Sequence, residues 1–338
     1  MRDFHDYNLL AHNTFGIEAL CRRFVEFDTV DELQQLVRSL QKEDFPLLLL
    51  GGGSNLLLTA DYPATVLHSA IKGMTHQEED DCVLLRVGSG EVWDEVVAAC
   101  VAQGWYGAEN LSLIPGEVGA SAVQNIGAYG TEVKDLIVVV EAVEIATGEI
   151  VRFSNAECAY AYRQSRFKQD WKNRFVITYV TYRLSKKFEP RLDYGNIRME
   201  LEKKGIGHPT AQELRDTIIE IREAKLPDPK IEGNGGSFFM NPIVTRQQFE
   251  LLLKRYPQMP HYFIDEKHEK IPAGWMIDQC GWKGRSLGRA GVHDKQALVL
   301  VNRGGATGQE IVDLCHVIQQ DVKTTFGIDI EPEVNILP

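Results

Sequence analysis

Apolar residues at helical spacing predict amphipathic helices in both halves of the chain. Residues 29–40 place four apolar side chains on one face, and Thr29 and Glu32 have the spacing of a capping box. A longer helix is expected over 308–326, which begins in the same way and keeps its apolar residues in phase. Further helices are expected at about 91–103, 211–224, 245–256 and 272–279.

Short apolar runs between turn residues predict strands. Phe45–Leu50 is a buried strand by its length and flanks, and it runs directly into Gly51. From Leu136 the pattern becomes typical of β-structure, with a turn at 147–148. Strands are expected at 83–87, 138–140, 143–145, 150–153, 175–184 and 297–301. We place the main boundary near residue 186, between a β-rich part and a smaller α+β part.

Length and charge limit the class of protein. A chain of 338 residues exceeds the size at which one hydrophobic core usually stops growing, so two or three domains are expected. The formal net charge of −12 argues against a nucleic-acid partner, because such proteins need a basic surface. An anionic ligand would therefore need a local cluster of cations and backbone amides.

Composition also indicates the compartment. The six cysteines are scattered without metal-like spacing, so we expect reduced packing cysteines and no metal site. Polar residues interrupt the N-terminus, which excludes a signal peptide, and no stretch has the length of a membrane span. We expect a soluble, cytoplasmic protein without a membrane partner.

Three glycine-dense segments are candidates for ligand binding. Gly51, Gly52 and Gly53, followed by Ser54 and Asn55, come directly after a buried strand. Consecutive glycines let backbone amides turn toward one point, as in loops that hold phosphate. The spacing fits neither a dinucleotide fingerprint nor a P-loop, and a plain tight turn is an equal alternative.

The second and third segments allow similar alternatives. Small residues recur over 114–130 without helical or strand periodicity, which indicates either a long surface loop or a backbone approached by a flat ligand. The third segment, 233–242, places Ser237 between a glycine run and Phe238. No nucleophile elbow surrounds Ser237, so it is either a turn residue or a group with another chemical role.

The motifs together resemble those of the UDP-N-acetylenolpyruvoylglucosamine reductase family, which makes a cell-wall precursor. They occur in order over nearly the whole chain, so the series is far more specific than any one motif. The motifs are Gly-Gly-Gly-Ser-Asn at 51–55, Ile-Pro-Gly at 114–116, Gln-Asn-Ile-Gly-Ala-Tyr-Gly at 124–130, Tyr-Arg at 162–163, Lys-Leu-Pro-Asp-Pro-Lys at 225–230, Gly-Ser-Phe-Phe at 236–239, Asn-Pro at 241–242, Ala-Gly-Trp-Met-Ile-Asp at 273–278 and Glu-Pro-Glu-Val at 331–334.

The resemblance implies an α+β fold. An FAD-binding module of the vanillyl-alcohol-oxidase (PCMH) type, in two subdomains, would cover 13–184. Residues 185–338 would form a linker and a C-terminal α+β substrate-binding domain, whose last segment returns to the active site. The polar segment around Tyr194 resembles the longer subclass, in which a tyrosine-bearing loop covers the substrate. The family also implies a monomer.

The resemblance further assigns residues to the cofactor and the substrate. The FAD-binding residues would be Gly51, Gly52, Gly53, Ser54, Asn55, Ile114, Pro115, Gly116, Ser121, Asn125, Gly127 and Tyr129. The UDP-sugar would be bound by Tyr129, Tyr194, Lys225 and Asn241. A lysine can neutralise phosphate, whereas Asn241 before a proline is more often a turn residue.

The implied reaction uses NADPH to reduce FAD, which then reduces the enolpyruvyl ether of UDP-N-acetylglucosamine at C3. Negative charge develops at C2 as an enolate, which needs stabilisation and then a proton. By resemblance Ser237 is the proton donor, Arg163 the stabilising cation and Glu333 a polar group at the carboxylate. Without the family, Arg163 and Glu333 would be read as solvated surface residues.

The chain departs from the family pattern at two positions. Glu117 stands where a small residue is usual, which brings negative charge near the flavin, and Met240 replaces a common lysine. Two alternatives to the reductase remain: another flavin oxidoreductase on the same FAD module, and a UDP-sugar-binding protein without activity. The motifs at 236–238 and 331–333 favour the reductase over the other flavin oxidoreductase.

Overall fold

The chain folds into two compact units, each of which contains helices and sheets. A computed structural model describes residues 1–338. The first unit comprises 1–7, 21–52 and 63–224, and the second comprises 8–20, 53–62 and 225–338. The division between them falls inside the glycine loop, after Gly52.

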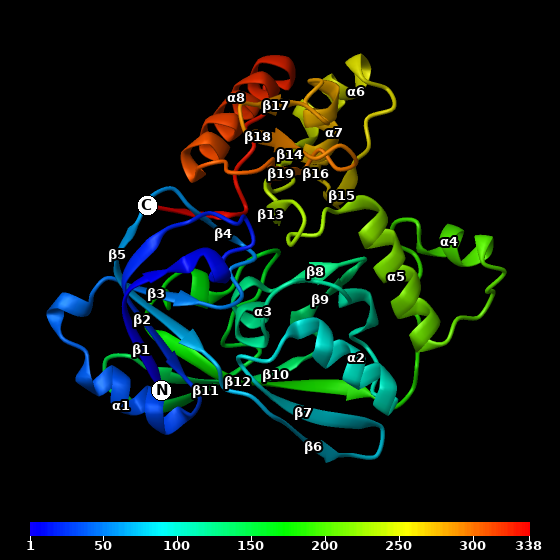
Figure 1. The fold of residues 1–338 in the computed structure, drawn as a ribbon. Helices are drawn as coiled ribbons and strands as arrows, with labels where there is room; N and C mark the ends of the chain where they lie inside the picture. The colour runs from blue at the N-terminus through cyan, green and yellow to red at the C-terminus, as the bar shows by residue number, and fades with distance from the viewer. The chain divides into compact units, whose positions relative to one another are not determined.

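The first unit contains two large sheets, a two-stranded sheet and five α-helices. Figure 1 shows their arrangement. One sheet has the order β1-β2-β5-β3, with β1 Arg2–Asn8, β2 Leu20–Phe27, β5 Tyr62–Ser69 and β3 Leu47–Leu50. The other has the order β11-β10-β12-β7-β6, with β11 Ile150–Ser154, β10 Ile137–Glu144, β12 Phe175–Ser185, β7 Cys82–Gly88 and β6 Met74–Glu78. The helices are α1 Val30–Ser39, α2 Trp93–Gln103, α3 Val118–Gln124, α4 Ile197–Lys203 and α5 Ala211–Lys225, and a small hairpin joins β8 Gly127–Ala128 to β9 Thr131–Glu132.

Most of the predicted elements of this unit are confirmed. The Thr29 side chain accepts a hydrogen bond from the Glu32 amide at the start of α1, as the capping-box spacing predicts. The Glu32 carboxylate accepts a hydrogen bond from the backbone amide of Asp28, whereas a standard capping box would use the amide of Thr29. The strands predicted at 138–140 and 143–145 are one continuous strand, β10, because its irregularity between Glu141 and Ala142 does not end the pairing with β12.

Helix α3 corrects the prediction that 114–130 lacks regular structure. Its residues are mostly small, so they show no apolar periodicity, although Val118, Ser121 and Ala122 are buried. A side chain at Gly119 would lie 3.0 Å from the Ser89 Cβ, so the helix packs at a distance that only a small residue permits. The left-handed conformation of Asn125 (φ 46°) ends it.

The second unit has one main core built on α8. Its sheets are β13-β19-β18-β17, β14-β16-β15 and the parallel pair β20-β4. The strands are β13 Gly233–Ser237, β19 Val299–Asn302, β18 Ala290–Val292, β17 Ser286–Leu287, β14 Ile243–Thr245, β16 His268–Lys270, β15 Tyr262–Asp265, β4 Leu56–Leu58 and β20 Asn335–Leu337. The helices are α6 Arg246–Arg255, α7 Ala273–Gln279 and α8 Gly308–Phe326. Figure 1 shows α8 lying along the sheet that contains β18 and β19.

The long helix α8 has the predicted bounds and the predicted capping box between Thr307 and Glu310. Its apolar face, including Ile311, Leu314 and Ile318, is fully buried in a core shared with Phe238. That core fixes the end of β13, where the candidate Ser237 lies.

Helix α5 packs in the first unit. Its Leu214, Ile218 and Ile221 form a cluster with α4 and the Tyr129 side chain. The predicted domains, 13–184 and 185–338, were defined by cofactor binding and substrate binding, and these limits stay a prediction. The compact units are defined by packing, and the last change from the first unit to the second falls after Ala224. None of the helices is long and apolar enough to cross a bilayer.

The first residue of α8 provides a test of the packing. A Cβ at Gly308 would lie 1.9 Å from the carbonyl oxygen of Leu58, and backbone cannot move away as a flexible side chain can. We expect Gly308→Ala to lower the free energy of unfolding by about 3 kcal/mol or more, as overpacking against backbone does. Chemical denaturation measures this change. Gly207→Ala is the control, since a Cβ at Gly207 meets nothing within 4 Å, and equal effects of both substitutions would contradict the prediction.

Candidate functional site

In the first unit, two glycine-containing loops approach each other at backbone distance. A Cβ built on Gly52 would lie 3.3 Å from the Gly116 Cα, and one on Gly51 would lie 3.2 Å from the Ala120 Cβ. Gly116 itself is in the left-handed region (φ 113°). The predicted cofactor segments 51–52 and 114–116 therefore do lie side by side, although they are far apart in the sequence.

The amides of this cradle are available to a ligand. The backbone hydrogen bonds of the chain include none donated by the amides of Gly51 or Gly52, whereas the Gly116 carbonyl accepts from the Trp93 amide at 3.0 Å. Adjacent amides without side chains suit phosphate oxygens, because nothing blocks close approach. The residues present thus fit the diphosphate of an FAD molecule.

Glu117, the unusual residue of this loop, is held by a buried histidine. His68 Nε2 lies 3.1 Å from Glu117 Oε1, and His68 Nδ1 lies 2.7 Å from Glu26 Oε2. Burial disfavours a charge on His68, but the hydrogen bonds to Glu117 and Glu26 outweigh it, so the pKa of His68 is raised. The imidazolium offsets the negative charge that Glu117 brings within 3.3 Å of the Cβ position of Gly51.

Arg163 lies on a strained turn that Asn125 holds in place. Ala161 and Gln164 exchange both backbone hydrogen bonds at 3.0 Å, and Arg163 between them has a φ of 56°, where glycine is normally preferred. The buried Asn125 donates to the Ala161 carbonyl at 2.8 Å. The Arg163 guanidinium donates to the Gly127 carbonyl at 2.9 Å, so the structure joins 125–127 to the Arg163 turn.

The two predicted substrate tyrosines of this unit lie together. Tyr194 packs over Gly130 and the ring of Tyr129 over Gly195, since a Cβ added to either glycine would lie 3.4–3.7 Å from the tyrosine side chain. Asn110, which sequence reasoning did not single out, donates to the carbonyls of both Tyr129 and Arg191, at 2.9 and 3.0 Å. One buried amide thus fixes the relative position of both tyrosine segments.

The second unit places the Glu333 backbone against Phe238, the residue that follows Ser237. The Glu333 amide donates to the Phe238 carbonyl at 2.7 Å, next to Ser237 at the end of β13. Ser237 is exposed while the neighbouring phenylalanines are buried, so the core fixes the backbone and leaves the hydroxyl accessible. Asn55 donates from its side chain to the Glu333 carbonyl at 3.3 Å, which adds a predicted cofactor residue to this cluster.

The remaining predicted residues of this unit are placed separately. Lys225 is exposed at the end of α5, and the Asn241 Oδ1 accepts from the Ala273 amide at the start of α7, at 2.9 Å. The amide nitrogen of Asn241 can still donate to a ligand, and Oδ1 retains a second lone pair. Gly53 (φ 61°) needs to be glycine because a Cβ there would lie 1.9 Å from the His12 carbonyl oxygen, and it leads into Ser54.

Several predicted cofactor side chains are used by the fold itself. The Ser121 hydroxyl donates to the Val118 carbonyl at 2.7 Å and contacts the Tyr182 hydroxyl at 3.2 Å. The Asn125 side chain donates to Glu132 and to the Ala161 carbonyl and accepts from the Lys134 amide. At these positions, and at Ile114 and Pro115, a ligand would be contacted through backbone or apolar surface.

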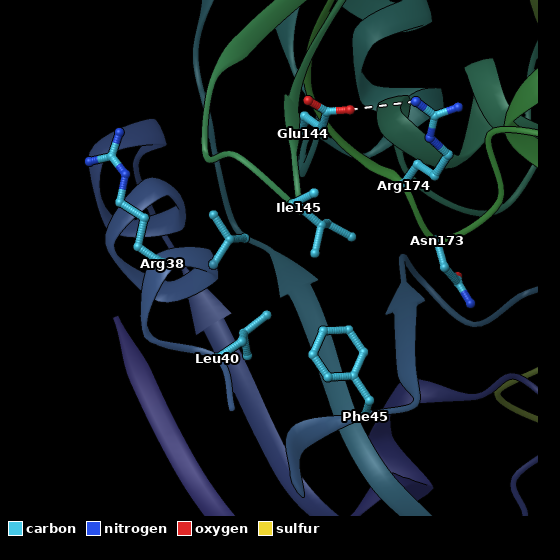
Figure 2. A pocket seen from close by; sticks show the side chains of 9 residues that line it. Arg38, Leu40, Phe45, Glu144, Ile145, Asn173 and Arg174 are labelled. Atoms are coloured by element: carbon cyan, nitrogen blue, oxygen red, sulfur yellow. Dashed lines mark ion pairs between the residues drawn. The ribbon is translucent and has the colours of Figure 1, made fainter. Parts of the chain in front are cut away.

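A pocket of about 560 Å³ lies elsewhere in the first unit and contains none of the predicted residues. Figure 2 shows Leu40, Phe45 and Ile145 around it, with Glu144 and Arg174 paired at 3.5 Å on its rim. Its lining holds no nucleophile, and its carboxylate, Glu144, is paired with Arg174, so we give the pocket no catalytic role. Nowhere in the chain do three or more His, Cys, Asp or Glu side chains form a metal-binding group.

Sequence reasoning missed His68 and Arg222. His68 is the one basic residue of the mostly buried strand β5, which was the available signal. Arg222 follows Arg215 by two helical turns on α5, so the two lie on one face. Neither signal identifies a partner, because Glu117 and Tyr129 are remote in the sequence.

Comparison with known proteins places this geometry in a family. A model of the UDP-N-acetylenolpyruvoylglucosamine reductase C-terminal domain matches residues 228–337, and a model of an FAD binding domain matches 21–154. A UDP-N-acetylenolpyruvoylglucosamine reductase of Bacteroides fragilis is 58% identical over 98% of this chain and 99% of its own length. The chain belongs to the UDP-N-acetylenolpyruvoylglucosamine reductase family.

Other members of the reductase family agree with this assignment. The enzyme of Flavobacterium johnsoniae is 46% identical over 98% of each chain, and that of Burkholderia vietnamiensis is 47% identical over 97% of this chain and 95% of its own. The crystal structure of the Thermus caldophilus reductase has a TM-score of 0.69 over 100% of this chain and 98% of its own, at 21% identity, which shows a shared fold.

The family assignment confirms the predicted fold class, α+β with an FAD-binding module and a C-terminal α+β domain. It also confirms that the chain is an oxidoreductase of peptidoglycan precursor synthesis. The roles of individual site residues stay predictions.

The His68 network predicts a pH-dependent stability. Because the folded-state pKa of His68 is raised, its contribution is fully present below the ordinary histidine pKa, near 6.5, and is lost as pH rises through the raised value. We expect His68→Gln to lower the free energy of unfolding by about 1.5–3 kcal/mol at pH 6 and by less at pH 9. Urea denaturation across this range measures the difference. His5→Gln, at an exposed position, is the control, and a difference independent of pH would contradict the prediction.

Proposed function

We propose that this protein reduces UDP-N-acetylenolpyruvoylglucosamine to UDP-N-acetylmuramate with FAD as cofactor and NADPH as the reductant. The observation that carries the proposal is the hydrogen bond from the Glu333 amide to the carbonyl of Phe238, the residue that follows Ser237, so that an accessible hydroxyl adjoins the segment that bears the Glu333 carboxylate. The FAD-binding domain and the family membership support the cofactor and the substrate.

FAD would be held at Gly51, Gly52 and the 114–116 segment of the first unit and would supply hydride transfer when bound. The glycine amides would bind its diphosphate, and the His68 imidazolium would limit the repulsion between that diphosphate and Glu117. In the second unit, Gly53 to Asn55 would contribute mainly through the backbone.

Ser237 would donate a proton to C2 of the reduced enolpyruvyl group. A serine hydroxyl is a weak acid, so this role is reasonable only toward a strongly basic carbanion such as an enolate. Arg163 would stabilise that enolate, because its turn fixes the guanidinium by a hydrogen bond to Gly127. Glu333 would contact the substrate carboxylate.

The UDP portion would be bound by Tyr129, Tyr194, Lys225 and Asn241. The packing of Tyr194 and Tyr129 over glycines supports the longer subclass, in which a tyrosine loop covers the substrate. We further propose a monomer that acts in the cytoplasm, where its nucleotide substrates are found and where six free cysteines would persist.

Anaerobic flavin spectroscopy tests the function. Protein loaded with FAD is reduced with NADPH, and UDP-N-acetylenolpyruvoylglucosamine is then added. The proposal predicts rapid return of the oxidised flavin spectrum with this substrate. Reoxidation by oxygen but not by the enolpyruvyl sugar would favour the alternative flavin oxidoreductase, and protein that never binds FAD would contradict both.

Ser237→Ala tests the proton donor. We expect flavin reduction by NADPH to be unchanged and reoxidation by the enolpyruvyl sugar to slow by about 10²–10⁴-fold, since only the second half-reaction needs the proton. Stopped-flow absorbance measures both steps separately. Ser237→Cys, which retains a dissociable proton, should recover part of the rate, and normal reoxidation by Ser237→Ala would rule out this role.

A further inference from the structure

Arg222 is a half-buried cation that forms no ion pair of its own in the first unit. Its Nε atom is buried without a hydrogen-bond partner in the protein. Burial lowers the pKa of the Arg222 guanidinium, the nearby Tyr129 and Asp94 offset only part of that effect, and Arg163 adds to it. The Tyr129 hydroxyl is a hydrogen-bonding neighbour of the guanidinium, so the unmet donor is the Nε–H group. Leaving a buried donor of a cation unmet is costly unless a ligand supplies an acceptor.

Asp94, a carboxylate near Arg222, is already bound to another arginine. Asp94 accepts two hydrogen bonds from Arg215, at 2.8 and 2.9 Å, in a forked arrangement. It also accepts from the Leu113 amide at 2.6 Å. Because such bidentate pairs are strong, Asp94 serves Arg215 rather than Arg222.

The other groups around Arg222 do not cancel its charge either. Tyr129 is uncharged, because burial raises the pKa of its phenol even though Arg222 acts in the opposite direction. Arg163 is a second cation. Glu132, which lies near the Arg163 turn at Gly127, is paired with Lys134 at 2.7 Å. Arg222, Arg163 and Tyr129 therefore form a positive, donor-rich cluster in a chain of net charge −12.

We propose that Arg222, together with the Tyr129 hydroxyl, binds an oxyanion of the substrate, a role that rests on the proposed function. The substrate offers two such groups, the enolpyruvyl carboxylate and the diphosphate. Both accept paired hydrogen bonds from a guanidinium, and both would neutralise the buried charge. The positive charge of Arg222 would thus serve ligand binding, although it lowers the stability of the protein without ligand.

Thermal unfolding of the FAD-loaded protein, measured without any UDP-sugar, separates this role from a structural one. Removing an uncompensated buried charge does not destabilise, whereas breaking a buried ion pair does. We expect Arg222→Met to unfold at the same or a higher temperature than the wild type. Arg215→Met, the matched control on the same helix, should unfold at least about 5 °C lower. A comparable loss with Arg222→Met would overturn the proposal.

Ligand titrations then identify the anion. Calorimetry is performed with UDP-N-acetylmuramate, which has both groups, with UDP-N-acetylglucosamine, which lacks the carboxylate, and with inorganic pyrophosphate. We expect Arg222→Met to bind at least about tenfold more weakly than the wild type. A loss confined to UDP-N-acetylmuramate assigns the carboxylate, and a loss shared by all three assigns the diphosphate.

Arg222→Lys keeps the charge but not the fork, so it should bind between the wild type and Arg222→Met. Wild-type affinity of Arg222→Met for every probe, or binding of no probe by the wild type, would overturn the proposal. The proposed function fails in a different measurement, the reoxidation of the flavin, so the two failures can be told apart.

Discussion

The buried side chain of Asn125 is the constraint on which the first half of the site depends. Its amide nitrogen donates to Ala161 and Glu132, and its oxygen accepts from the Lys134 amide. The same residue ends α3 in a left-handed conformation. One residue therefore connects the glycine-rich segment to the Arg163 turn, and the strain at Arg163 persists because the surrounding hydrogen bonds determine it.

Sequence patterns predicted the helices and strands whose formation depends on residues close to one another in the sequence. The bounds of α1 and α8 followed from capping boxes and apolar spacing, because a cap needs only neighbours in the sequence. Helix α3 escaped detection because small residues carry no periodicity, and tertiary packing against Ser89 holds it instead. The resemblance supplied the candidate residues, but not the fact that Ser121 and Asn125 use their side chains within the fold.

The contacts that shape the site join residues remote in the sequence, which no single-chain pattern reveals. Glu117 raised the question of a negative charge near the flavin, and the answer is His68, 49 positions away. The net negative charge of the chain does not reveal how its individual acidic and basic side chains are paired. Acids and bases are matched at Arg86 and Glu141 and at Arg215 and Asp94, but not at Arg222.

The pairing of β20 with β4 has a consequence for the order of synthesis. Asn335 bonds to Asn55, 280 positions earlier, and the Glu333 segment is anchored by the same contacts. Strand β4 emerges early from the ribosome, yet it has no partner until residues 335–337 have been made. Contacts of such long range form late, because the intervening chain must first be ordered. All residues of the first unit can thus be synthesised while the chain still lacks the segment in which the Glu333 amide bonds to the Phe238 carbonyl.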